Sequence, residues 1–166
     1  VILGNYPMAS EPIIDPATLD PNNEALSKEQ VLGLNRQRYE FEQLDKLIAF
    51  DAEEGMAVGF KHQSEEEFWI RGHIPGRPLM PGVLMIEMAA QVSSLIFHLK
   101  FDPEGEKFFG FAGVDKVKFR GSVEPGDDLV MVVKATRLRS RMASFEAQGF
   151  VGDKFVFEGE ITGVVL

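Results

Sequence analysis

The sequence predicts an α+β fold in which an antiparallel sheet wraps around one long central helix. Three features predict it: an apolar segment at residues 82–99, strand-like alternation in the second half of the chain, and turn residues between the strands. A helix that is apolar on nearly every side must be enclosed by protein. Antiparallel strands with one wet face can supply that enclosure.

Residues 82–99 form the predicted central helix, because their apolar side chains are distributed almost all the way round it. Pro81 suits its first turn, where a missing N–H costs little. Glu87, Gln91 and His98 interrupt the apolar run. We therefore expect a buried core helix rather than a membrane span.

About five antiparallel strands are predicted around this helix. Apolar and polar residues alternate with a period of two, which is typical of strands with one exposed face. Turn residues separate several of these stretches. The strand candidates are residues 39–50, 56–61, 116–120, 143–151 and 155–160, with turns at residues 53–55, 124–127 and 151–153.

Two parts of the chain are distinguished by composition. Residues 1–26 are rich in Pro, Asp and Asn and lack periodicity, which indicates an extended or poorly ordered arm. Ser27-Lys28-Glu29-Gln30 has the form of a capping box, so a short helix is expected to run to about Arg36. We assign residues 1–35 to an N-terminal arm and residues 36–166 to the main domain.

The composition excludes several functional classes. The 166 residues include no cysteine, which rules out disulfides, thiol nucleophiles and Cys-ligated zinc. The net charge of −9 argues against nucleic-acid binding. No signal peptide is recognisable, so a cytoplasmic location is expected. His62, His73 and His98 have no metal-ligand spacing, so no metal is predicted.

His73 and Glu87 are the candidate catalytic residues. Glu87 lies between Ile86 and Met88, where ionisation of a carboxyl group is costly, so it is suited to donate a proton. His73 lies in a proline-rich loop just before the helix, and histidine exchanges protons readily near neutral pH. Either residue alone is more often structural, but together, on a loop and helix that adjoin, they indicate acid–base chemistry.

The start of the helix is a candidate binding site for a carbonyl oxygen. The N–H groups that follow Pro81, at Gly82 and Val83, have no partner within the helix and carry partial positive charge. An enolate-like oxygen placed there would be stabilised. Gly82 has no side chain, so we expect it to leave room for the substrate to approach.

At this point the sequence resembles a known family. Residues 72–91 read GHIPGRPLMPGVLMIEMAAQ, which is similar to the signature of the 3-hydroxyacyl-[acyl carrier protein] dehydratases of type II fatty acid synthesis. Similarity extends to residues 111–120, FAGVDKVKFR, and to Pro-Gly-Asp at residues 125–127. The resemblance covers about residues 36–166.

The resemblance implies a hotdog fold and a role for each motif residue. His73 would be the base, Glu87 the acid that handles the β-hydroxyl, and the Gly82 N–H a ligand of the thioester carbonyl. Gln91 would orient Glu87, and Pro81 and Val83 would complete the substrate-binding end of the helix. The implied product is a trans-2-enoyl thioester, with no metal or organic cofactor.

The same resemblance implies partners and leaves alternatives. The partners are an acyl carrier protein and a second copy of the chain, because His and Glu come from different subunits of a homodimer in this family; a hexamer built from three dimers is the larger option. Glu87 stands where the dehydratase-isomerase branch has Asp, and Gly110 where a tunnel-gating Tyr is common. The alternatives are a hotdog thioesterase, a dehydratase of a specialised lipid or polyketide pathway, and a non-catalytic acyl-binding subunit.

Overall fold

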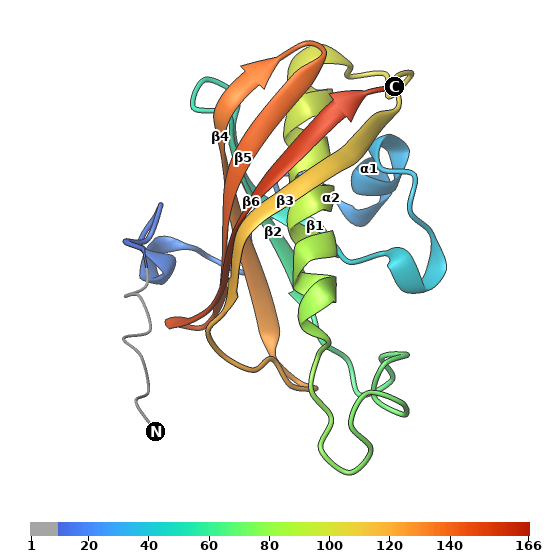
Figure 1. Cartoon of the computed structure of the whole chain (residues 1–166), viewed down its shortest axis with the longest axis vertical. Coiled ribbons are helices and arrows are strands. Elements are labelled where there is room, and N and C mark those ends of the chain that lie inside the picture. Colours follow the sequence, from blue (N-terminus) through green and yellow to red (C-terminus); the bar gives the residue numbers. More distant parts are fainter. Residues whose placement is uncertain (1–9) are drawn as a thin grey trace.

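The computed structural model describes residues 10–166, in which a curled six-stranded antiparallel sheet wraps around one long helix, α2 (Figure 1). The strand order is β1-β2-β4-β5-β6-β3. This is the hotdog arrangement, and the predicted α+β fold is confirmed. The elements of this domain are α2 (Gly82–Phe101), β1 (Lys46–Asp51), β2 (Met56–His62), β3 (Phe109–Phe119), β4 (Asp128–Arg139), β5 (Met142–Val151) and β6 (Lys154–Val165).

The main hydrophobic core lies between α2 and the concave face of the sheet. Met88, Val92 and Leu95 of α2 are fully buried there, against side chains such as Phe145 and Phe157 of the sheet. Although α2 is long and apolar enough to cross a membrane, 61% of its most apolar 18-residue stretch is buried inside the protein. It is therefore a core helix, as the sequence predicted.

One stripe of α2 is left open, which corrects the expectation that the helix is enclosed on all sides. Val83 is 66% exposed, and Glu87, Ala90 and Ser94 are partly exposed. These positions follow one another at spacings of three and four residues, so they share one helix face. A sheet from a single chain curls around the rest of the helix and does not reach this face.

The two edges of the sheet differ. The edge at β1 is covered, because Leu26 forms an antiparallel bridge with Leu47. The opposite edge is β3, which pairs with β6 on one side and has no strand beyond it among residues 10–166. Phe111, Val114 and Phe119 are exposed along β3. A long, apolar, unpaired edge is a template for pairing with another strand.

The predicted strand at residues 39–50 is too long at its start. Strand β1 begins only at Lys46, and Tyr39–Phe41 forms a short 3-10 helix, η2. Tyr39 has a φ of 60°, which no β-strand residue adopts. In addition, the carbonyl of Phe41 and the N–H of Gln43 bond to the side chain of Gln91 instead of to a neighbouring strand.

The N-terminal segments pack around the helix–sheet core, and the buried side chain of Val31 belongs to that core. Helix α1 (Lys28–Leu34) begins with the predicted capping box, in which the Ser27 and Gln30 side chains bond to each other's backbone N–H. It ends two residues before the predicted limit at Arg36. Pro81, which was expected inside the first turn of α2, is instead its N-cap residue, with a ψ of 127°.

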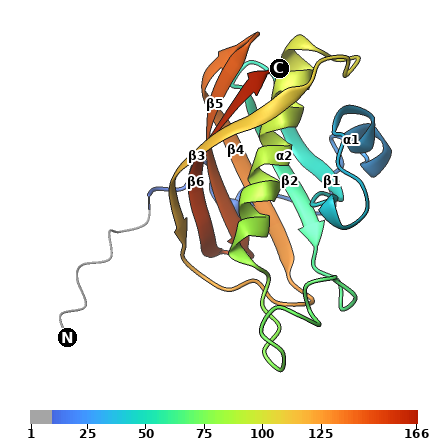
Figure 2. The same ribbon diagram turned by 45° about the vertical axis from the view of Figure 1, so that its right-hand side comes forward.

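Residues 10–19, which include the 3-10 helix η1 (Pro16–Thr18), lie on the convex face of the sheet, opposite α2 (Figure 1 and Figure 2). Ile13, Ile14 and Leu19 pack there against a second apolar cluster that includes Val130 and Val132. The described part of the predicted arm is thus packed rather than loose. The remainder of that prediction, residues 1–9, lies outside the described residues.

This arm explains why the sequence did not reveal β4. Leu129, Met131 and Val133 face the main core, whereas Val130 and Val132 face the cluster under the arm. Both faces of β4 are therefore buried here, so its sequence is a continuous apolar run without a period of two.

Candidate active site

His73 lies in the loop between β2 and α2, which extends past the N-terminal end of α2 and away from the sheet (Figure 1). Three prolines within residues 75–81 prevent a regular helix or central strand. Ile74 and Gly76 have positive φ values of 58° and 85°, which turn the chain sharply beside His73. The loop geometry is therefore fixed by its own backbone.

Both ends of this loop are anchored in the protein. Trp69 is 3% exposed and belongs to the main core, and its carbonyl accepts the backbone N–H of His73 at 2.7 Å. Met80 is also buried, and its N–H donates to the carbonyl of Val123 at 2.8 Å. Residue 73 is thereby held near the start of α2.

The imidazole of His73 is oriented by one hydrogen bond, from Nδ1 to the carbonyl oxygen of Leu79 at 2.6 Å. A carbonyl can only accept, so Nδ1 carries a proton. In the neutral ring, Nε2 is then the unprotonated nitrogen. This tautomer is the one in which Nε2 can act as a proton acceptor.

Glu87 lies on the open stripe of α2, and its Oε1 accepts a hydrogen bond from Nε2 of Gln91 at 2.8 Å. The carboxyl group lines a small groove between α2 and the strands β3 and β6. The groove is lined by Gln37, Glu87, Ala90, Ser93, Ser94, Phe109, Gly110, Phe111, Ile161, Thr162 and Gly163. Small residues on both walls, such as Ala90 and Gly110, leave the groove narrow, and both polar and apolar groups line it.

Gln91 connects Glu87 to the segment before β1. Its Nε2 also donates to the carbonyl of Phe41 at 2.6 Å, and its Oε1 accepts the backbone N–H of Gln43 at 3.1 Å. The side chain of Asn35 donates to the Gln91 carbonyl. The sequence did not point to these three partners, because they lie about 50 residues away and two of them act through the backbone.

The N-terminal end of α2 presents the N–H groups of Gly82 and Val83. Pro81 has no N–H, and the N–H of Leu84 donates to the Pro81 carbonyl at 2.9 Å. A Cβ at Gly82 would lie 2.8 Å from the ring of Phe119. The glycine is therefore in close contact with this residue of β3, and its role in substrate approach stays a prediction.

Some predicted site residues come together and others do not. Glu87 and Gln91 are in contact, and Pro81, Gly82 and Val83 form the exposed end of the same helix. His73 lies in the adjoining loop, and no hydrogen bond joins it to Glu87 within residues 10–166. Gly110 lines the groove beside Glu87, and a Cβ on it would meet Leu166 at 3.0 Å.

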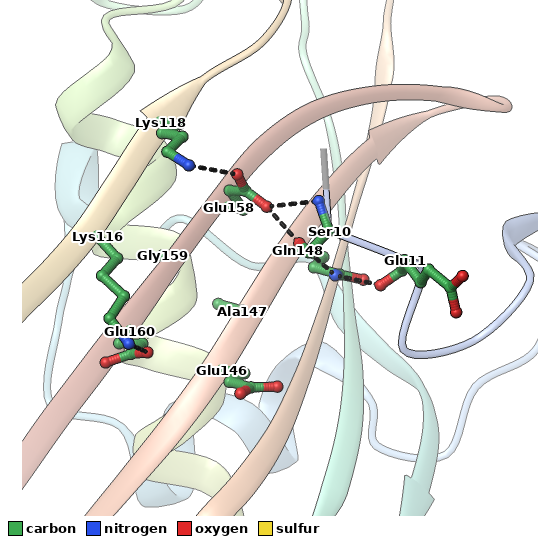
Figure 3. A pocket seen from close by; sticks show the side chains of 10 residues that line it. All are labelled: Ser10, Glu11, Lys116, Lys118, Glu146, Ala147, Gln148, Glu158, Gly159 and Glu160. Atoms are coloured by element: carbon green, nitrogen blue, oxygen red, sulfur yellow. Dashed lines mark hydrogen bonds and ion pairs between the residues drawn. The ribbon is translucent and has the colours of Figure 1, made fainter. Parts of the chain in front are cut away.

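A separate, larger hollow lies on the convex face of the sheet, away from α2, where the arm meets β5 and β6 (Figure 3). Its two lysines are paired: Lys116 bonds to Glu160 at 2.7 Å and Lys118 lies 3.6 Å from Glu158. Burial alone would raise the pKa of Glu158, but hydrogen bonds from Ser10 and Arg120 outweigh it and lower that pKa. The hollow therefore anchors the arm. Among residues 10–166, no His, Asp or Glu cluster is placed to hold a metal ion.

Solved structures define the class of fold. A dehydratase heterocomplex from Xenorhabdus doucetiae superposes with a TM-score of 0.67 at 14% identity, covering 82% of this chain and 90% of that one. A mutant thioesterase from Pseudomonas aeruginosa gives a TM-score of 0.64 at 16% identity, covering 86% and 96%. At these identities the likeness shows the hotdog fold alone.

Sequence comparison defines the family. The family model for the FabA-like domain matches residues 35–160. The 3-hydroxyacyl-[acyl-carrier-protein] dehydratase FabZ of Desulfotalea psychrophila is 38% identical over 79% of this chain and 87% of its own length. FabZ of Clostridioides difficile is 38% identical over 82% and 94%. The chain belongs to the FabA-like family, among the FabZ dehydratases.

Proposed function

We propose that this chain removes water from (3R)-3-hydroxyacyl-[acyl carrier protein] and forms trans-2-enoyl-[acyl carrier protein] in type II fatty acid synthesis. The enzyme is a hydro-lyase. The observation that carries this conclusion is its 38% identity to FabZ dehydratases over most of both chains. The fold by itself does not separate dehydration from thioester hydrolysis, because thioesterases share it.

In the proposed mechanism, His73 and Glu87 move the two protons of the elimination. Nε2 of His73 takes the proton from C2, and the electron pair of that C–H bond forms the C2=C3 double bond. The C3–O bond breaks, and Glu87 gives its proton to the departing hydroxyl, which leaves as water. The proton on His73 then returns to Glu87 before the next turnover. Elimination of water needs only these proton transfers, so the proposal includes no metal or cofactor.

The exposed end of α2 is proposed to bind the thioester carbonyl. The N–H groups of Gly82 and Val83 point out of the helix end, where its partial positive charge lies. Negative charge that develops on the carbonyl oxygen as the C2 proton leaves would be stabilised there. Pro81 fixes the chain entering this turn, and Gln91 orients Glu87.

A homodimer is proposed, and two open surfaces support it. Edge strand β3 exposes Phe111, Val114 and Phe119, and the adjoining stripe of α2 exposes Val83. Pairing of β3 with β3 of a second copy would cover both surfaces and place the His73 loop of one chain at Glu87 of the other. Each active site is then shared between subunits. A hexamer would repeat this dimer three times.

The carrier protein is proposed to dock beside the His73 loop. Arg71 and Arg77 are exposed in that loop and could contact an acidic partner. Arg120 is a weaker candidate, because it forms an ion pair with Glu158. The enzyme is also proposed to be cytoplasmic. Its dehydratase domain would comprise residues 36–166, preceded by an arm at residues 1–35.

The function is tested by following enoyl thioester formation through its ultraviolet absorbance, using 3-hydroxyacyl thioesters of several chain lengths. Wild type is compared with Glu87→Gln, which keeps the shape of the side chain but removes the acid. We expect turnover by wild type and a loss of roughly 10²- to 10⁴-fold in the variant. Release of free thiol without enoyl product would instead identify a thioesterase.

Shared active sites are tested by mixing two inactive variants, His73→Ala and Glu87→Gln, under conditions that allow subunit exchange. After exchange, half of all dimers would contain one chain of each variant. Each of these dimers would have one intact site. Activity should therefore return to about a quarter of the wild-type value. Sites contained within one chain would show no recovery.

A further inference from the structure

The carboxamide of Gln91 can adopt only one orientation. Gln91 is 2% exposed, and its two amide ends face backbone groups of opposite polarity. The N–H of Gln43 can only donate to Oε1, and the carbonyl of Phe41 can only accept from Nε2. A flipped amide would leave the buried Gln43 N–H and the Phe41 carbonyl without these partners, which is unfavourable.

This orientation determines what Glu87 meets. Because Nε2 of Gln91 is fixed toward Glu87, Oε1 of Glu87 always faces an N–H donor. The carbonyl oxygen of a protonated carboxyl group is a better acceptor than its hydroxyl oxygen. When Glu87 is protonated, Oε1 is therefore the carbonyl oxygen and the proton is on Oε2.

The segment that supplies these backbone groups is itself held firmly. The Gln43 side chain is buried and donates to the Glu40 carbonyl at 2.8 Å. Lys28 of α1 donates to the carbonyl of Leu44 at 2.6 Å and forms an ion pair with Glu42 at 3.1 Å. The positions of the Phe41 carbonyl and the Gln43 N–H therefore depend on the packing of α1 and η2.

We infer that residues 41–43 are a positioning element, which locks the Gln91 amide and so places the acid proton of Glu87 on Oε2. The inference rests on the proposed function, and it concerns positioning residues that do not themselves touch the substrate. Without the lock, Glu87 would lose its fixed donor, and its proton could sit on either oxygen. Substrate binding would be little affected, whereas proton delivery would be slower.

The inference is tested with Gln91→Met, which keeps the length of the side chain but removes both polar ends. We expect kcat to fall roughly ten- to hundredfold while KM changes less than about twofold. Gln43→Leu keeps the backbone N–H but removes the bond to Glu40, so it should lower kcat less. The matched control is Gln148→Met, because Gln148 is also a buried glutamine but bonds to the arm on the far face.

A pH series separates the lock from a merely structural role. In Gln91→Glu, the new carboxyl group can donate to Glu87 only when it is protonated. The ratio of its kcat to that of wild type should therefore rise as the pH falls, and Gln91→Met should show no such rise. A wild-type kcat in Gln91→Met, or a pH-independent ratio in Gln91→Glu, would overturn the inference.

Failure of the function and failure of the lock give different results. A wild-type enzyme that forms no enoyl product would contradict the proposed function. The lock is then tested independently by NMR, through the exchange rate of the side-chain amide protons of Gln91. In the wild type these protons should exchange slowly with solvent. Rapid exchange of those protons would contradict the lock, whatever the activity.

Discussion

The ring of Phe119 fills the space that a side chain at Gly82 would need, since a Cβ there would lie 2.8 Å from its Cε1 atom. This contact joins the start of α2 to the edge strand β3, the two elements that border the candidate site. A side chain at Gly82 would therefore force either the Phe119 ring or the helix end to shift.

Replacing Gly82 with alanine should displace the helix end or the ring. Gly82→Ala is expected to cost about 1–3 kcal/mol of unfolding free energy, as overpacked sites do, and to lower turnover. A double-mutant cycle with Phe119→Ala, measured by denaturant unfolding, checks the cause. If Gly82→Ala costs as much without the ring as with it, the contact is not responsible.

His73 should be essential for turnover but not for folding. It lies in a loop outside the core, so His73→Ala is expected to abolish dehydration while the melting temperature and the oligomeric state stay close to those of wild type. His62→Ala is the control, because His62 forms an exposed ion pair with Asp128 away from α2. Undiminished turnover in His73→Ala would remove His73 from the mechanism.

The C-terminal end of α2 should give the protein an acid-sensitive component of stability. Burial alone would raise the pKa of Asp102, but hydrogen bonds from the Lys107 N–H and the His98 ring outweigh it and lower that pKa. The folded protein therefore binds this proton less readily than the unfolded chain. The stabilisation is present above the unfolded pKa of about 3.9 and is lost as the pH falls through the lower folded value.

Thermal unfolding of wild type and Asp102→Asn between pH 7 and pH 2 tests this expectation. The difference in melting temperature should be largest near neutral pH and shrink as the pH falls below about 4. Asp153→Asn, in the exposed turn between β5 and β6, should show no such trend. A constant difference for Asp102→Asn would show that Asp102 stabilises the fold without its charge.

The open edge of β3 should hold the dimer together. Val114 is 37% exposed near the middle of β3. Val114→Asp would place a charge there, and sedimentation is expected to show a monomer that has lost dehydratase activity. Thr136→Asp, on an exposed part of β4, should leave the assembly unchanged. A monomeric wild type would contradict both the dimer and the shared site.

The sequence by itself determined the helix and most strands, and it predicted the acid–base pair. Residues 82–99 are apolar all round, so only a core helix fits them, and the motif from His73 to Gln91 indicates the family because it is contiguous. Local patterns of this kind are set by neighbours along the chain. They can therefore be read without coordinates.

Only the tertiary structure decided the features that depend on distant segments. Strand β4 lacks alternation because the arm buries its second face, and β1 starts late because Gln91 takes the Phe41 carbonyl and the Gln43 N–H. The close contact at Gly82 is with a ring 37 positions away in the sequence. Hydrogen bonds to the backbone and close packing leave no local signature in residue type, so these relationships appear only once the chain has folded.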